Sequence, residues 1–101
     1  MLKDKFSMVI QGRTIDISIN IPVEGKEDLT YRIQTFESKS GEYVAVVCTD
    51  KNSGEEMTEI LKDRRGAYGA KFNFKPDCFE YFEITVNFDS DLDAVNIYVI
   101  Y

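Results

Sequence analysis

The sequence predicts a mainly β (α+β) fold, in which an antiparallel sheet of about seven strands curls into a sandwich or an open barrel. One short helix is expected between the fourth and fifth strands. Apolar and polar residues alternate along most of the chain, as they do in half-buried strands. The alternating runs are joined by short links, which favours antiparallel pairing. Strands and helices do not alternate, so a doubly wound nucleotide-binding fold is not expected. The 101 residues correspond to a single domain, residues 1–101.

The first two strands are expected to pair as a hairpin. Residues 6–11 and 14–21 both alternate with a period of two. A two-residue loop at residues 12–13 would pair Gln11 with Thr14 and place both apolar rows on the same face. A glycine in the first loop position suits the type II′ turn that such a hairpin needs.

Two further strands follow before the predicted helix. Residues 29–34 alternate, with apolar side chains at every second position. Residues 43–49 are apolar on both faces, which predicts a strand that is central in its sheet or packs under the helix.

A helix is expected over residues 53–66. Ser53 and Glu56 have the spacing of a capping box, and Gly66 is a suitable stop. The apolar residues at helical spacing between them are Met57, Ile60 and Leu61. The predicted helix has about three turns, so it would need the sheet to stabilise it.

The last three strands are expected at residues 68–75, 81–88 and 95–101. If Phe88 faces Val95, the apolar rows of the final two strands lie on the same side. The opposite face would then carry Tyr81, Glu83, Tyr98 and Ile100.

The composition argues against most enzyme chemistry. The chain has no histidine, so it has no Ser–His or Cys–His pair and no imidazole ligand. It has no glycine-rich phosphate loop, and we expect neither an enzyme nor a cofactor. The absence of a secretion signal or a long apolar run predicts a cytoplasmic protein without membrane contact. Cys48 and Cys78 are then expected to be free thiols.

The distribution of charge gives the main functional indication. The net charge is −6, and residues 1–75 carry 12 acidic and 12 basic residues. Residues 76–101 carry six acidic residues and no lysine or arginine, so this segment holds the whole net charge. An uncompensated acidic field steers basic partners, and tyrosine is common at interface centres. The candidate partner-binding residues are therefore Glu80, Tyr81, Glu83, Asp89, Asp91, Asp93 and Tyr98.

Two other patterns are weaker. Asp89, Asp91 and Asp93 have the odd-position spacing of a calcium loop, but Ala94 and Ile100 stand where an EF-hand needs glycine and glutamate. A solvated acidic turn is the commoner meaning of that pattern, and we expect no metal site. Residues 65–72 partly resemble the basic, glycine- and aromatic-containing strand of RNA-recognition modules, but a glycine replaces the stacking ring. Direct nucleic-acid binding is not expected.

We therefore expect a non-enzymatic protein-interaction module or inhibitor that occupies a basic partner surface. The partner could be a nucleic-acid-processing protein, with the acids imitating phosphates. Small size and acidity are shared with phage-encoded inhibitors of host defence, including anti-CRISPR proteins, although no motif carries this likeness. The alternatives are a structural protein that self-associates through an open edge at residues 95–101, and a β-module that binds calcium or a small ligand.

Overall fold

The computed structural model describes residues 3–9, 14–20, 24–25, 27–37, 39, 43–61, 68–77, 79–88 and 94–101. These residues form eight strands and no helix. The strands are β1 (Lys3–Val9), β2 (Ile15–Ile19), β3 (Leu29–Glu37), β4 (Val44–Asp50), β5 (Glu56–Leu61), β6 (Tyr68–Asn73), β7 (Glu83–Phe88) and β8 (Ala94–Ile100).

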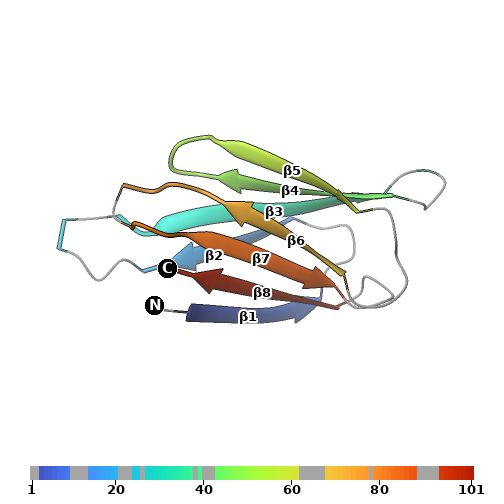
Figure 1. Cartoon of the computed structure of the whole chain (residues 1–101), viewed down its shortest axis with the longest axis horizontal. Coiled ribbons are helices and arrows are strands. Elements are labelled where there is room, and N and C mark those ends of the chain that lie inside the picture. The colour runs from blue at the N-terminus through green and yellow to red at the C-terminus, as the bar shows by residue number, and fades with distance from the viewer. Residues whose placement is uncertain are drawn as a thin grey trace.

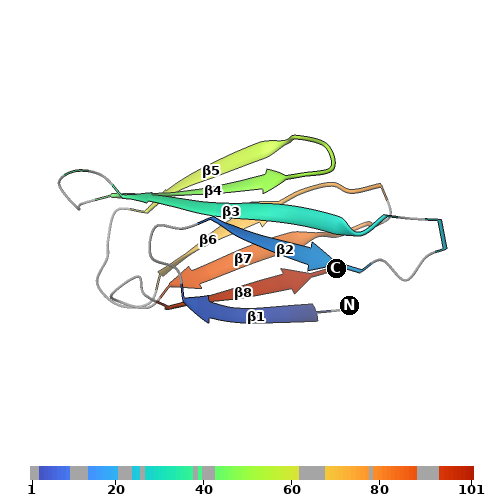
Figure 2. The same cartoon turned by 180° about the vertical axis from the view of Figure 1, so that it is seen from behind.

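The strands form two four-stranded antiparallel sheets, shown in Figures 1 and 2. Sheet A has the order β1-β8-β7-β6, and sheet B has the order β2-β3-β4-β5. Sheet B is a plain meander, because each strand pairs with its neighbour in the chain. Sheet A instead joins β1 to β8, which lies at the other end of the sequence.

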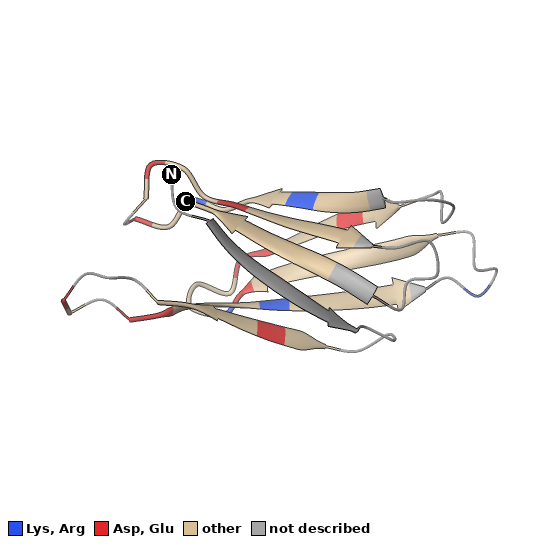
Figure 3. Cartoon of the chain, turned by 90° about the horizontal axis from the view of Figure 1, so that it is seen from below, with Lys and Arg blue, Asp and Glu red and all other residues tan. Residues whose placement is uncertain are grey.

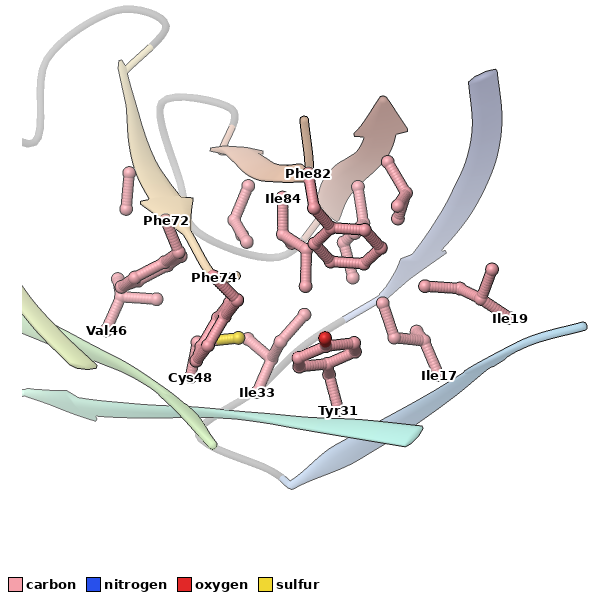
Figure 4. Close-up of a cluster of buried hydrophobic side chains, with 14 of the residues drawn as sticks. Ile17, Ile19, Tyr31, Ile33, Val46, Cys48, Phe72, Phe74, Phe82 and Ile84 are labelled. Atoms are coloured by element: carbon pink, nitrogen blue, oxygen red, sulfur yellow. The ribbon is translucent and has the colours of Figure 1, made fainter. Parts of the chain in front are cut away.

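One hydrophobic core lies between the two sheets. The Tyr31 ring of sheet B lies 4.9 Å from the ring of Phe74 and 5.2 Å from that of Phe82, which belong to the other layer (Figure 4). Ile33 and Ile84 are fully buried in the same cluster. Both sheets therefore bury the apolar side of their alternating strands against each other, as the mainly β prediction requires.

Two features of the predicted sheets are confirmed. The fourth strand is central: β4 lies between β3 and β5, with Val46 and Cys48 fully buried on its inner face. Phe88 lies opposite Val95, which is the predicted register of the final two strands. The described residues form eight strands, where about seven were expected.

The predicted hairpin between the first two strands is wrong. β1 pairs with β8 in sheet A, with Phe6 opposite Ile97, while β2 pairs with β3 in sheet B. Alternation predicts that one face of a strand is buried, but it does not identify the partner strand. The predicted loop at residues 12–13 lies outside the described residues.

The predicted helix is also wrong, because residues 56–61 form the strand β5. The preceding segment makes a tight turn instead of a helix cap. The Asp50 carboxylate accepts hydrogen bonds from the backbone N–H groups of Asn52 and Ser53, at 2.8 and 3.1 Å. Gly54 has φ of 83°, in the left-handed region that glycine favours, and reverses the chain into β5. The predicted end of the helix at Gly66 lies outside the described residues.

The predicted open edge at residues 95–101 is absent. β8 is hydrogen-bonded to β1 on one side and to β7 on the other. This strand therefore offers no unpaired edge to a second copy, and self-association through it loses its structural premise.

Candidate functional site

A hydrogen-bonded cluster surrounds Glu83 on the outer face of sheet A. The Tyr81 hydroxyl donates to Oε2 of Glu83, and the Thr85 hydroxyl donates to Oε1 at 2.8 Å. Nζ of Lys71 lies 3.7 Å from the same Oε1. Glu83 is only 6% exposed, although its side chain lies on the outer face. Neighbouring side chains on three elements therefore cover an ionised carboxylate.

The pKa values of the pair follow from this geometry. The hydrogen bond from Tyr81 lowers the pKa of Glu83 below its ordinary value, although burial acts in the opposite direction. The same hydrogen bond raises the pKa of Tyr81, and burial adds to that increase. At neutral pH, Glu83 is therefore ionised and Tyr81 carries the proton that joins them.

Glu83→Gln is expected to lower the free energy of unfolding by about 1.5 kcal/mol at pH 7, because it removes the charge from a covered hydrogen-bond acceptor. A carboxylate whose pKa is lowered by folding stabilises the protein above its unfolded pKa, near 4.5. That stabilisation is lost as the pH falls through the lower folded pKa. Urea unfolding should therefore show a larger difference in the free energy of unfolding between wild type and variant at pH 7 than at pH 3.

The exposed neighbour Glu80 provides the control for this measurement. Glu80→Gln should leave the free energy of unfolding nearly unchanged at both pH values. If the difference in the free energy of unfolding between wild type and Glu83→Gln is the same at pH 7 and pH 3, the assigned role of the Glu83 charge is contradicted.

The structure places the predicted partner-binding residues at different depths. Glu80 and Tyr81 are exposed in the connection before β7. Tyr98 is half-buried on β8, where it lies opposite Thr85 on the same outer face as Glu83. Asp89, Asp91 and Asp93 lie outside the described residues, and so does Cys78.

The sequence indicated that Glu83 has no counter-charge, and the structure corrects this. Lys71 belongs to β6, which lies beside β7, with Lys71 itself opposite Thr85. A basic residue twelve positions away in the chain therefore faces the acid. In the free protein, Glu83 is engaged by its own neighbours, and among the predicted partner-binding residues that the structure describes, Glu80 and Tyr81 are exposed.

Acidic residues in links of both sheets lie at the end of the molecule where β1 begins and β8 ends, as the red segments of the ribbon show (Figure 3). The link before β3 and the turn after β4 meet there, because Asn52 donates through Nδ2 to the Asp28 carbonyl oxygen at 3.2 Å. The connection between β6 and β7 reaches the same end, with Phe79 against Tyr101 at 4.9 Å between ring centroids. The exposed acids of this acidic end are Glu24, Glu27, Asp28, Glu55, Asp77 and Glu80.

The structure describes few basic side chains at the acidic end. Among the side chains that the structure describes there, the basic ones are Lys51 and Lys75. The sequence did not indicate this grouping of acids, because residues 1–75 carry no net charge as a whole. Four of the six acids belong to that neutral part, on two links, and they meet the other two acids only where a third link joins them in the fold. A partner with a basic surface would encounter these acids together.

The structure gives no sign of a metal centre in the part of the chain that it describes. No group of three or more metal-ligating side chains occurs among those residues. They also contain no helix with the length and apolar composition that crossing a membrane requires. Asp89, Asp91 and Asp93 lie outside the described residues, so the expectation that they form no metal site stays a prediction, which calorimetric titration with calcium can test.

Comparison with known proteins adds no relative. No protein-family model, no curated protein and no solved structure matches this chain. The functional argument therefore rests on the chemistry of the side chains described above.

Proposed function

We propose that this protein is a non-enzymatic interaction module that occupies a basic surface of a partner protein. The observation that carries this proposal is the acidic end, where six exposed acids from both sheets accompany two described lysines. Such a surface attracts a basic partner over a distance and repels an acidic one.

Tyr81 supplies the apolar part of this surface. Its side chain is 43% exposed, next to the exposed acid Glu80. The hydrogen bond to Glu83 holds its hydroxyl in one position before any partner arrives. A side chain that is already ordered loses less entropy on binding, so Glu83 acts as a positioning residue for Tyr81. Tyrosine is among the residues that contribute most at interface centres.

The finer form of the proposal is an inhibitor that imitates a nucleic acid. Carboxylates on a rigid β scaffold can occupy a channel whose lysines and arginines otherwise bind phosphates. Asp89, Asp91, Asp93 and Tyr98 would extend the contact along sheet A. A phage-encoded counter-defence protein acting in the cytoplasm would have these properties, and the buried free thiol of Cys48 suits a reducing compartment.

Neutralising the acidic end is expected to weaken partner binding at least tenfold and to leave the thermal midpoint nearly unchanged. The variant combines Glu24→Gln, Glu27→Gln, Asp77→Asn and Glu80→Gln, which are all exposed. The wild-type protein first captures its partner from host lysate at low salt, and the affinity of the purified partner is then measured for both proteins. Attraction between exposed charges is screened, so wild-type binding should fall as salt rises.

The control variant combines Asp16→Asn with Arg32→Gln. These residues form an exposed ion pair on sheet B, with Nε of Arg32 2.9 Å from Oδ1 of Asp16, and their removal leaves the net charge unchanged. The control should bind the partner as wild type does. Equal binding by the neutralised variant, or failure to capture any basic protein, would contradict the proposed function.

A further inference from the structure

The outer edge of sheet B at β5 has backbone groups that pair with no strand of the described residues. The Asp50 N–H donates to the Glu55 carbonyl oxygen at 2.8 Å, which fixes the pattern of the antiparallel ladder between β4 and β5. Bonded and non-bonded pairs alternate along such a ladder, so the N–H and C=O groups of Glu56, Thr58 and Ile60 point away from β4. β6 lies near this edge but belongs to the other sheet, and the described residues provide no ladder between the two.

An apolar row crosses the outer face of sheet B and ends at this edge. Phe36 lies opposite Ala45, and Ala45 lies opposite Ile60. Phe36 is 54% exposed and Ile60 is 53% exposed, so a row across three strands remains open to solvent. A strand added beside β5 would extend this row by one more side chain and cover Ile60.

Two glutamates give the edge its chemical preference. Glu56 lies on the outer face, while Glu59 lies on the core-facing row between Met57 and Leu61 and is nevertheless exposed. Neither glutamate forms an ion pair with another described residue. An inward-pointing charge on an edge strand opposes pairing with an apolar strand or with an identical acidic one. A basic residue opposite each glutamate would remove that obstacle.

We propose that β5 binds an extended basic segment of a partner protein, which becomes a fifth strand of sheet B. The segment carries lysine or arginine opposite Glu56 and Glu59, and apolar residues opposite Met57 and Ile60. Backbone hydrogen bonds to Glu56, Thr58 and Ile60 provide the affinity, and the alternating side chains provide the specificity.

The β5 edge lies in sheet B, whereas Glu80 and Tyr81 of the acidic end precede β7 in sheet A, and Glu55 of the acidic end directly precedes β5. A single basic partner can bind both surfaces, but each of the two proposals is tested by its own experiment. Variants of Glu80 or Tyr81 should leave strand addition at β5 unchanged, so its test is independent of the proposed function.

The probe is an end-blocked peptide that contains Val-Val-Lys-Thr-Val-Lys, written in the antiparallel direction opposite residues 61 to 56. At saturating peptide, hydrogen exchange at the amides of Glu56, Thr58 and Ile60 should slow at least tenfold. The amides of Met57 and Glu59 already donate to β4 and should change less. The matched control peptide replaces both lysines by glutamate and should not bind. Equal protection by the two peptides would overturn the proposal.

Variants of the protein separate the backbone contribution from the charge contribution. Thr58→Pro removes an outward N–H without breaking the β4 ladder, so it should abolish peptide binding while the fold remains. Thr58→Val keeps that N–H and should bind as wild type does. Glu56→Gln combined with Glu59→Gln should weaken binding about three- to tenfold, as two cross-strand charge pairs predict. Unchanged binding by Thr58→Pro, or a wild-type dimer in sedimentation that Thr58→Pro dissociates, would overturn the proposed occupant.

Discussion

Replacement of Phe82 by alanine is expected to lower the free energy of unfolding by about 3–5 kcal/mol. Phe82 is 2% exposed, and its ring lies 5.2 Å from that of Tyr31 in sheet B and 5.9 Å from that of Phe79. The substitution leaves a cavity where the two layers meet. A domain of this size has roughly 5–15 kcal/mol of stability, so the variant should be close to unfolding at ambient temperature. Urea denaturation followed by tyrosine fluorescence measures the change.

Phe36→Ala is the matched control, because the same atoms are removed from a side chain that is 54% exposed. Its expected cost is about 1 kcal/mol or less. Equal losses for the two variants would mean that Phe82 does not occupy the closed interior between the sheets.

Cys48 is expected to react with a thiol reagent about a thousandfold more slowly in the folded protein than in the unfolded chain. Burial, with a smaller effect from Asp50, raises the pKa of the Cys48 thiol from 9.0 to about 12. The thiolate is the reactive form, so its fraction near neutral pH falls by about three orders of magnitude. The side chain is also fully covered, with its sulfur inside the core (Figure 4).

Iodoacetamide labelling measures this rate in a Cys78→Ser variant, which leaves Cys48 as the only thiol. The same protein in urea is the reference for the unfolded rate. Labelling of the folded protein within tenfold of that reference would show that the core opens readily, and it would contradict the closed packing of β4.

The helix prediction failed because the spacing of apolar residues in β5 fits two structures. Met57 and Leu61 are four positions apart, which places them on one face of a helix and also on one face of a strand. The structure uses the second solution, with both side chains packed against the core and Ile60 exposed on the other face. Pairing with β4 overrides the local capping pattern, and the glycine at position 54 completes the turn that makes this pairing possible.

The positions of most strands follow from alternation, but their partners do not. The register of Phe88 and Val95 was predictable because only a short link separates the two strands. β1 and β2 are also neighbours in the chain, yet they belong to different sheets. A period of two satisfies either arrangement, so only the tertiary packing distinguishes them.

The candidate site was predictable only in part. The exposure of Glu80 and Tyr81 agrees with a role at a surface. The cover over Glu83 depends on Thr85 of the same strand and on Lys71 of the paired strand β6. Local alternation places Thr85 on the face of Glu83, but no local pattern indicates Lys71. The acids of the links before β3 and after β4 join the acidic end only through the fold, whereas the sequence shows them within a neutral segment.

The pairing of β1 with β8 has a consequence for how the chain folds. Sheet B consists of sequential hairpins, so its contacts are local and can form early. Sheet A closes only when residue 3 meets residue 100, and the entropy of that long loop must be lost before the ladder provides any compensation. We therefore expect folding to take milliseconds to seconds, because the pairing of β1 with β8 joins strands that are far apart in the sequence. Sheet B should become structured first.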